Sequence, residues 1–257
     1  MTSYEILGRT VTIPVEVRRA RSWFASFAVP AGRVAELVGP AGLEPATLPG
    51  GRAMLSLAFV RYEDGDLDPY REIAVAFLVA DPEQPKNKGA YIHRLPVDQE
   101  FTCAAGRDIW GFPKFVTPIE ITEGTSARSR VAREGRGRHR PSETEELRAD
   151  RAVLTVDGRM ALTITQRRGV PAPMRSTAVD AFSFADGVLR RTRWELRGAK
   201  SRMRPGGARV ELGTGEIADE LRSLGMPKRA LMSGCIGEVA MTFQAAEVVT
   251  RATAPAD

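Results

Sequence analysis

The chain has few of the residues that hold metals or form disulfides. Its 257 residues include two cysteines and two histidines, and Cys103 and Cys235 lie far apart with no metal-binding spacing. A disulfide framework needs more cysteines, so we expect two buried thiols in a reducing cytoplasm. No Gly-x-Gly-x-x-Gly or Walker sequence occurs. The sequence therefore predicts neither a metal nor a nucleotide cofactor.

Long apolar runs are also missing. No stretch reaches the roughly 18 apolar residues of a membrane-spanning helix, and the N-terminus has no apolar signal segment. Hydrophobic residues make up 43% of the chain and charged residues 27%, which is typical of a globular protein. We expect a cytoplasmic protein with no membrane partner, in which residues 1–257 form a single domain.

An excess of charge of one sign is present only locally. The net charge is +5, from 37 basic and 32 acidic residues. The segment 124–151 contains an Arg-rich and Gly-rich run that includes His139. Clustered arginines can bind phosphate, but here no aromatic residue interleaves with them to stack on bases. We expect a solvated loop or hairpin excursion and no nucleic-acid partner.

Short apolar runs separated by turn signals dominate the pattern, which predicts many strands. The expected strands cover 53–62, 72–79, 90–95, 115–122, 153–156, 160–165, 194–200, 208–212 and 239–243. Helices are expected at 31–38 and 214–224, the second of which ends at Gly225 before Pro227. The fold class predicted is α+β and rich in β-structure.

Lysine is scarce, and one lysine occupies an apolar setting. The chain has five lysines among its 37 basic residues, and Lys114 follows Trp110, Phe112 and Pro113 and precedes Phe115. Burial disfavours an ammonium group and can lower its pKa, and a neutral amine is a nucleophile toward carbonyl carbons. Alternatively, the lysine stem packs on apolar residues while its ammonium group reaches water. The local residues alone leave both interpretations open.

The segment Gly106-Arg107-Asp108-Ile109-Trp110-Gly111-Phe112-Pro113-Lys114 resembles the active-site segment of the acetoacetate decarboxylase family. Tyr70-Arg71-Glu72 is similar to the family segment that supplies an active-site carboxylate. Arg21-Ser22-Trp23-Phe24 resembles the segment that contributes a pocket arginine, and Gly89 to Gly106 resembles the strand and turn before the lysine. The resemblance covers most of residues 12–250. It implies a closed antiparallel β-barrel or cone with peripheral helices, and a homo-oligomer.

The resemblance also implies roles for individual residues. Lys114 would form a Schiff base with a small carbonyl substrate, a reaction known from this family and carried over from it. Glu72 would orient the iminium or move protons, and Arg21 would bind a substrate carboxylate. Trp110 and Phe112 would surround the substrate with apolar surface, or simply pack in the core. His93 would contact the substrate, or act as a hydrogen-bonded core histidine.

One position departs from the family pattern. The decarboxylases carry a second lysine directly after the first, whereas this chain has Phe115, which would point away from Lys114 in a strand. Without that neighbouring cation, apolar surroundings, alone or together with Arg21 or Arg107, would have to lower the pKa of Lys114 by about 3 units from its usual ~10.4. Decarboxylation of a keto acid is the first expectation. An aldolase, dehydratase or cyclase acting on a keto acid or polyketide-like substrate in secondary metabolism is the second. A non-catalytic ligand-binding barrel, which a normal, high pKa of Lys114 would support, is the third.

Overall fold

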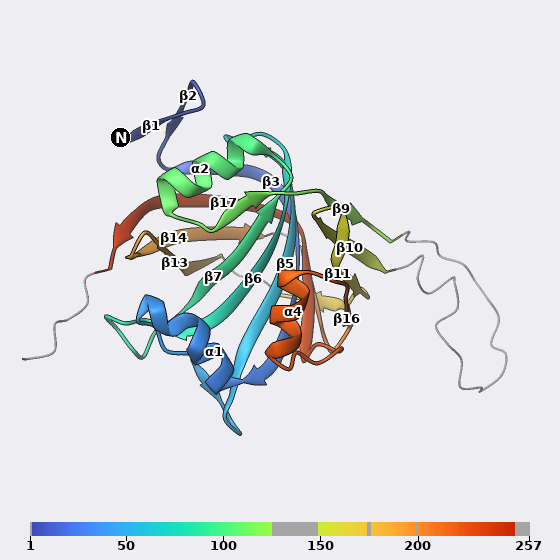
Figure 1. The fold of residues 1–257 in the computed structure, drawn as a ribbon. Helices are drawn as coiled ribbons and strands as arrows, with labels where there is room; N and C mark the ends of the chain where they lie inside the picture. The colour runs from blue at the N-terminus through green and yellow to red at the C-terminus, as the bar shows by residue number, and fades with distance from the viewer. Residues whose placement is uncertain (1, 125–148, 174–175, 199, 250–257) are drawn as a thin grey trace, which may run out of the picture.

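Seven strands form a closed barrel in the computed structural model, which describes residues 2–124, 149–173, 176–198 and 200–249. Around the ring, β3, β5, β6, β7, β13, β14 and β17 follow one another, and β17 pairs with β3 to close it (Figure 1). Their bounds are Val15–Pro30, Arg52–Gly65, Tyr70–Ala80, Lys88–Val97, Thr177–Ala185, Val188–Gly198 and Met232–Val248. The closed, β-rich barrel with peripheral helices is confirmed.

The ring is antiparallel except at one junction. β13 runs parallel to β7, with Ala181 opposite Ala90 and Phe182 opposite Tyr91. Parallel neighbours need a long crossover connection, and the chain between these two strands contains a helix and most of a second sheet. The fully antiparallel barrel implied by the resemblance is therefore corrected at this position.

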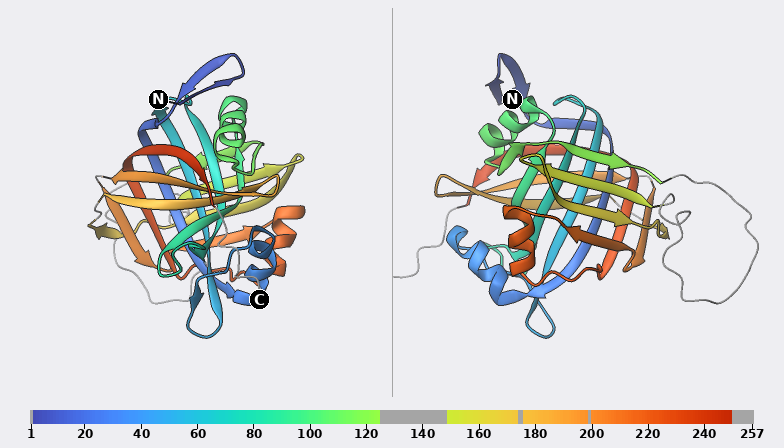
Figure 2. Two further views of the ribbon diagram at one scale, coloured as in Figure 1. Left: turned by 90° about the vertical axis from the view of Figure 1, so that its left-hand side faces the viewer. Right: turned by 45° about the vertical axis from the view of Figure 1, so that its right-hand side comes forward.

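A four-stranded antiparallel sheet lies against one side of the barrel (Figure 2). Its order is β16 (Ala208–Leu212), β11 (Arg159–Gln166), β10 (Asp150–Val156) and β9 (Ile119–Thr122). The helices are α1 (Ala31–Val38), the 3-10 turn η1 (Gly39–Ala41), α2 (Glu100–Trp110) and α4 (Glu216–Ser223). The shorter strands are β1 (Ser3–Ile6), β2 (Arg9–Thr12), β4 (Thr47–Leu48), β8 (Lys114–Val116), β12 (Val170–Ala172) and β15 (Ser201–Pro205).

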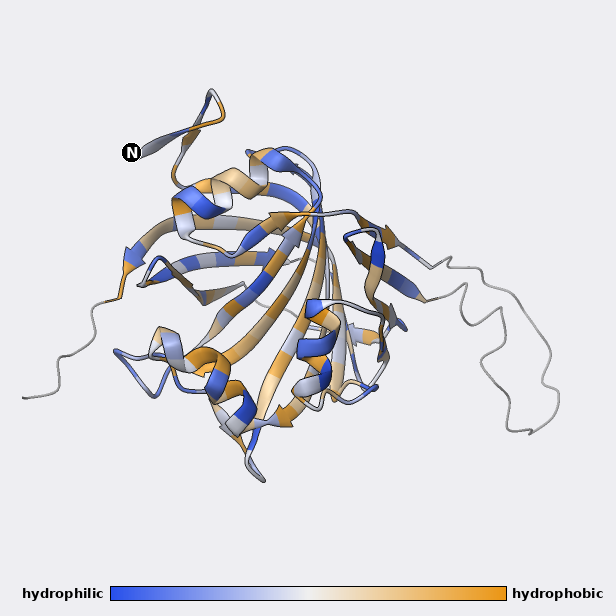
Figure 3. Cartoon of the chain, in the orientation of Figure 1, coloured by the Kyte–Doolittle hydropathy of each residue, from blue (hydrophilic) through white to orange (hydrophobic). Residues whose placement is uncertain are grey.

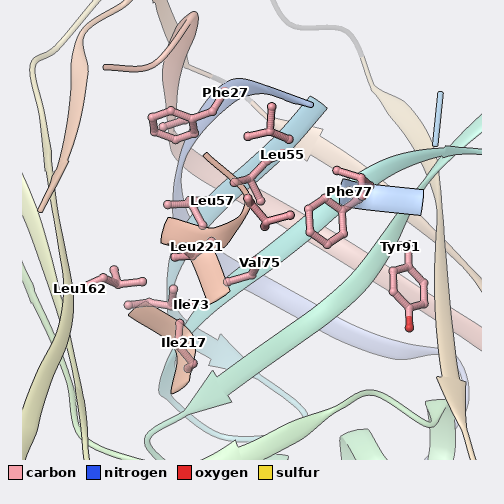
Figure 4. Close-up of a cluster of buried hydrophobic side chains, with 14 of the residues drawn as sticks. Phe27, Leu55, Leu57, Ile73, Val75, Phe77, Tyr91, Leu162, Ile217 and Leu221 are labelled. Atoms are coloured by element: carbon pink, nitrogen blue, oxygen red, sulfur yellow. The ribbon is translucent and has the colours of Figure 1, made fainter. Parts of the chain in front are cut away.

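The side-chain alternation of the barrel strands separates two apolar clusters. The outer cluster fills the space between the barrel, the second sheet and helices α1 and α4, as the close-up in Figure 4 shows for Phe27, Leu57 and Phe77 with Leu162 and Leu221. The inner cluster lines the barrel itself. In Figure 3, β5 and β6 carry long apolar runs, as strands that are covered on both faces do. The main core therefore lies outside the barrel, which leaves the interior free for a site.

Helix α2 was not expected from the sequence, where its residues were interpreted as a turn. The side chain of Gln99 accepts a hydrogen bond from the Thr102 backbone N–H at 2.5 Å and so caps the helix N-terminus. Gly111 ends the helix with φ at 63°, a left-handed conformation that glycine adopts without strain. Gly111 followed by Pro113 was a readable stop signal. The helix matters because its end fixes where Lys114 begins the next strand.

The predicted strands differ from the observed ones mainly at their ends. The strand expected over 115–122 is two strands, β8 and β9, separated by Thr117 and Pro118. The barrel strands β3 and β13 were missed, and so were the short strands β1, β2, β4, β12 and β15. The Arg-rich segment falls mostly on residues 125–148, which lie outside the described residues, as does His139. Within the described part of the chain, no helix is long and apolar enough to cross a membrane.

An ion-pair cluster joins α4 to β7, and its loss should lower the stability of the fold in acid. Burial alone would raise the pKa of Glu220, but hydrogen bonds from His93 (2.9 Å) and Arg94 (2.8 Å) outweigh it and lower the pKa to about 2. A lowered carboxyl pKa stabilises the fold above the unfolded value of about 4.5, and this contribution is lost as the pH falls toward 2. We expect a loss on the order of 2 to 3 kcal/mol over that window.

The matched variants for this cluster are Glu220→Gln and Glu216→Gln. Glu216 also contacts Arg94, at 2.6 Å, but its side chain is 78% exposed. Urea unfolding at pH 7 and pH 3 should show that Glu220→Gln is less stable at pH 7 and less sensitive to acid. Glu216→Gln should behave as the parent does. Equal pH dependence in all three proteins would contradict this assignment.

Candidate active site

The barrel interior holds a cavity of about 110 Å³ that opens to solvent. Its wall is largely apolar and contains two carboxylates, Glu72 and Asp68, and one ammonium group, that of Lys114. Among the described residues that line the cavity, Lys114 is the only cation. Asp68 is half-exposed and pairs with Arg9 at 2.5 Å, so the buried charges of the cavity are those of Lys114 and Glu72.

The turn after α2 places Lys114 in the barrel. The backbone N–H groups of Gly111 and Phe112 donate to Arg107 and Gly106, each at 3.0 Å, which closes the helix end. The chain then enters β8, where Lys114 lies opposite Leu95 of β7. The lysine is 4% exposed and its side chain runs across Gly106 of α2. The site therefore depends on the meeting of one helix end and one short strand.

Gly106 provides the space through which the lysine stem passes. A Cβ atom at this position would lie 2.4 Å from Cδ and 2.7 Å from Cε of Lys114. Gly106→Ala should therefore move the amine while the gain in helix propensity, about 1 kcal/mol, limits the loss of stability. We expect Schiff-base formation to slow by about 10²-fold, as small misplacements of a reacting group do.

The control for that variant is Gly32→Ala in α1, where the added Cβ meets nothing within 4 Å. It should gain a little stability and react as the parent does. Rates of borohydride-trapped adduct formation and melting temperatures of the two variants test this. Equal adduct rates in both would show that Gly106 does not position Lys114.

Lys114 is held by two partners in the cavity wall. Its Nζ lies 3.0 Å from Oε2 of Glu72 and donates to Oγ1 of Thr102 at 3.1 Å. The same atom lies 5.0 Å from the centre of the Tyr70 ring. Glu72, on β6, is 7% exposed and accepts a hydrogen bond from the Tyr62 hydroxyl at 3.1 Å. A continuous polar path therefore runs from Tyr62 through Glu72 to the amine.

The pairing with Glu72 reverses the expected direction of the lysine pKa. Burial alone would lower the pKa of Lys114, but attraction by Glu72 and, to a smaller degree, Tyr70 outweighs burial and raises the pKa. The resting site thus holds an ammonium–carboxylate pair. The sequence-based expectation of an amine kept neutral by apolar surroundings is corrected, because it did not include a carboxylate at 3.0 Å.

The two tyrosines near this pair keep their protons at neutral pH. Burial raises the pKa of Tyr62 well above its usual value, and the nearby Glu72 charge raises it further. Burial also raises the pKa of Tyr70. The two rings stack with centres 4.1 Å apart. Tyr62 is therefore a stable hydrogen-bond donor to Glu72.

Two of the predicted substrate-binding aromatics line the cavity. Trp110 and Phe112 lie in the wall with ring centres 5.9 Å apart, and the indole N–H of Trp110 donates to the Gln244 carbonyl oxygen at 2.8 Å. Phe115 points to the other side of β8 and packs against the outer cluster, as the alternation of strand side chains predicts.

Arg21 and His93 are not brought to this cavity. Ser22 and Ile92 line it, so their neighbours in β3 and β7 face outward. Arg21 is 40% exposed and pairs with Glu63 at 3.3 Å and Glu123 at 2.7 Å. His93 belongs to the cluster with Glu220 described above. Arg21 and His93 therefore do not line this cavity, and His93 instead makes the hydrogen bond of the second role expected for it.

Sequence reasoning missed Tyr62 and Thr102 as parts of the site. Tyr62 faces Tyr70 across the β5–β6 pair, a register that needs the strand pairing to be known. Thr102 reaches Lys114 from α2, a helix that was not expected. Among the described residues, no group of three or more His, Cys, Asp or Glu side chains is arranged to hold a metal ion.

Comparison with known proteins adds a family and a set of similar folds. The family described as Acetoacetate decarboxylase (ADC) matches residues 9–252. No match is found among curated proteins. A solved acetoacetate decarboxylase is 15% identical with a TM-score of 0.67, covering 95% of this chain and 92% of that one. The acetoacetate decarboxylase of Legionella pneumophila subsp. pneumophila str. Philadelphia 1 is 16% identical, with a TM-score of 0.65 and coverage of 96% and 92%.

The enduracididine biosynthesis enzyme MppR, solved in complex with pyruvate, has a similar fold. It is 16% identical, with a TM-score of 0.66 and coverage of 94% of this chain and 92% of that chain. At these identities the solved structures establish a shared barrel architecture.

Proposed function

This chain belongs to the acetoacetate decarboxylase family, and we propose that it is a lyase that decarboxylates a keto acid through a Schiff base at Lys114. The observation that carries the proposal is a buried lysine in an apolar cavity with a carboxylate 3.0 Å from its amine. A buried pair of this kind supplies both a nucleophile and an acid–base group to one bound carbonyl.

The first steps use the lysine–glutamate pair. Glu72 takes a proton from Nζ of Lys114, and the neutral amine adds to the substrate carbonyl carbon. A proton passes from the added nitrogen to the former carbonyl oxygen to give a carbinolamine, and the protonated Glu72 then returns its proton to that hydroxyl, which leaves as water and gives an iminium. Thr102 holds Nζ in place through its hydroxyl oxygen. The raised pKa of Lys114 is compatible with this route because the group that raises it is also the proton acceptor.

The iminium then serves as an electron sink. The bond to the carboxylate carbon breaks, carbon dioxide leaves, and the electron pair forms an enamine. A proton that passes through the hydrogen-bonded Tyr62 and Glu72 is added to the enamine carbon. Water hydrolyses the resulting iminium, which releases the ketone and frees the amine.

The composition of the wall favours loss of the carboxylate. A bound keto acid would place its carboxylate against apolar residues, in a cavity whose one cation becomes the iminium. Decarboxylation removes that negative charge, so its transition state is disfavoured less by an apolar wall than the charged ground state is. A reaction that keeps the carboxylate gains no such advantage here.

Aldol condensation or dehydration through the same enamine is the second candidate. The enamine is common to both reactions, and MppR, which shares the fold, has been solved with the condensation product of pyruvate and imidazole 4-carboxaldehyde. The Tyr62–Glu72 hydrogen bond could serve the proton transfers of either reaction. A barrel that binds carbonyl compounds without turnover is the remaining alternative, which Phe115 and the raised pKa of Lys114 keep open.

Product analysis separates the three alternatives. Acetoacetate and other β-keto acids should yield carbon dioxide and a ketone in equal amounts, faster than the spontaneous reaction, and Lys114→Met should remove the excess rate. A condensation product from a 2-oxo acid and an aldehyde, without carbon dioxide, would favour the aldol candidate. Binding of these compounds with no product of either kind would establish the non-catalytic barrel.

A further inference from the structure

The amine of Lys114 lies over the ring of Tyr70. Its Nζ is 5.0 Å from the ring centre, within the distance of about 6 Å at which a cation is attracted to the face of an aromatic ring. Tyr70 is buried and lines the cavity, so water screens this attraction only weakly. Among the described aromatic residues, Tyr70 is the one over whose ring this amine lies.

The orientation of the Tyr70 ring is fixed by its neighbours. The ring stacks on that of Tyr62, with centres 4.1 Å apart and planes within 14°. Tyr62 lies opposite Tyr70 across the β5–β6 pair, and Glu72 follows two residues later on the same face of β6. The charged partner and the aromatic partner of Lys114 therefore come from one face of one strand, and both are in place before a substrate binds.

The ring and the hydrogen bonds act differently on a Schiff base. The ammonium of Lys114 has three N–H donors and uses them on Glu72 at 3.0 Å and on Thr102 at 3.1 Å. A protonated Schiff base keeps a single N–H, so it can donate fully to only one of these partners. Attraction by an aromatic face needs no N–H, since aromatic rings also bind quaternary ammonium groups. The ring therefore remains a partner of the nitrogen when a hydrogen bond is lost.

The charge on this nitrogen is what makes the Schiff base reactive. The protonated form accepts the electron pair of the breaking bond, whereas loss of its proton gives a neutral imine, which is a poor electron sink. The titratable groups that act on the nitrogen are those of Glu72 and Tyr70 on β6 and Cys103 on α2, and Tyr62 on β5 reaches it through Glu72. An attraction that holds the proton on the nitrogen therefore favours decarboxylation.

We propose that the ring of Tyr70 stabilises the positive charge on the Lys114 nitrogen, first that of the ammonium and then that of the iminium formed with a keto acid. Tyr70 is then a catalytic residue that acts through the face of its ring and not through its hydroxyl group. The iminium part of this assignment rests on the proposed function, whereas the ammonium part rests on the geometry of the free site alone.

Two variants separate the ring from the hydroxyl group. In Tyr70→Leu, which removes the ring, kcat for acetoacetate should fall by about 10-fold. The high-pH limb of its kcat profile should lie about one pH unit below that of the parent, because a nitrogen without this attraction releases its proton more readily. Tyr70→Phe keeps the ring face, so it should keep the high-pH limb of the parent and lose no more than about 3-fold in kcat. Turnover measured from pH 5 to 10 gives these profiles.

Fluorinated phenylalanines at position 70 separate the charge distribution of the ring from its shape. One, two or three fluorine atoms withdraw electron density from the ring face with little change in size, so log kcat should fall steadily along the series. The matched control is Tyr91→Leu, because Tyr91 and Tyr70 are both 8% exposed but Tyr91 packs in the outer cluster. It should lower stability without moving the high-pH limb. Equal kcat along the fluorinated series, or a limb moved as far by Tyr91→Leu as by Tyr70→Leu, would overturn the proposal.

Titration of the free amine separates failure of this inference from failure of the proposed function. With lysine labelled at Nζ with nitrogen-15, the resonance of Lys114 is identified by its absence in Lys114→Met, and its pKa is measured without substrate. A lower pKa in Tyr70→Leu than in Tyr70→Phe, with no turnover of any keto acid, would support the contact between ring and cation and reject the decarboxylase. Turnover of acetoacetate with equal pKa values and a flat fluorinated series would support the decarboxylase and reject the role of Tyr70.

Discussion

Replacing Lys114 by methionine should reduce keto-acid turnover by at least about 10⁴-fold and abolish covalent trapping, because removal of a catalytic nucleophile has effects of this size. Lys114 is the only amine among the described residues that line the cavity, so none of these residues can take its place. Steady-state carbon dioxide release by the parent and the variant gives the comparison. Lys200→Met, at a lysine whose side chain is 76% exposed, is the control and should be fully active.

Loss of stability must be separated from loss of chemistry in this variant. Lys114→Met leaves Glu72 buried without its cation, which typically costs about 3 to 5 kcal/mol. The double variant Lys114→Met/Glu72→Gln removes both charges and should recover most of that stability while remaining inactive. Turnover above a thousandth of the parent rate in the folded double variant would contradict a nucleophilic role for Lys114.

Replacing Glu72 by glutamine should have the second-largest effect on turnover. It should also shift the pH dependence of borohydride trapping to lower pH. Burial lowers the pKa of Lys114 and the Glu72 charge raises it, so removing that charge leaves burial with less opposition and the pKa falls. More of the amine is then neutral near pH 7. The rate of borohydride trapping should therefore reach its plateau at lower pH in Glu72→Gln than in the parent.

Overall turnover should nevertheless fall in Glu72→Gln, by about 10²- to 10³-fold, because the amide cannot exchange protons with the carbinolamine or the enamine. Glutamine keeps the size of the side chain and an oxygen that can accept from Tyr62. Trapping rates and carbon dioxide release, both measured from pH 5 to 10, give the two profiles. An unchanged trapping midpoint, or one moved to higher pH, would contradict the role given to Glu72.

The same pair should contribute to stability with the opposite sign of pH dependence from Glu220. A raised lysine pKa stabilises the fold at every pH below the unfolded value of about 10.4, and the contribution is lost as the pH rises through the raised value. Acid therefore removes the stabilisation that the α4–β7 cluster gives, and strong alkali removes the stabilisation that the Lys114–Glu72 pair gives.

The sequence predicted the main elements of the site better than their electrostatics. Lys114 and Glu72 were singled out from short segments, and the structure brings them within 3.0 Å of each other. The direction of the pKa shift of Lys114 could not follow from the sequence, since it depends on that distance. A neighbourhood of Trp110 and Phe112 alone predicts desolvation, whereas the carboxylate decides the net shift.

The sequence also left undetermined which face of a barrel strand points into the barrel. Strand alternation shows that Arg21 and Trp23 share one face of β3, but both faces of β3 carry apolar residues, because one packs on the second sheet and the other lines the cavity. The pattern therefore could not tell which face points inward. Short apolar runs predicted many of the barrel strands, whereas closure and the parallel β7–β13 junction involve contacts between distant segments.

Peptide mapping after reduction shows whether Lys114 forms a Schiff base. The parent protein is mixed with acetoacetate, reduced with borohydride, digested and analysed by mass spectrometry, beside Lys114→Arg treated in the same way. We expect an isopropyl group on Lys114, the mass left when decarboxylation precedes reduction, and no modification at this position in the variant. Full turnover by the parent with Lys114 unmodified under these conditions, or with the adduct on another lysine, would contradict a Schiff base at Lys114.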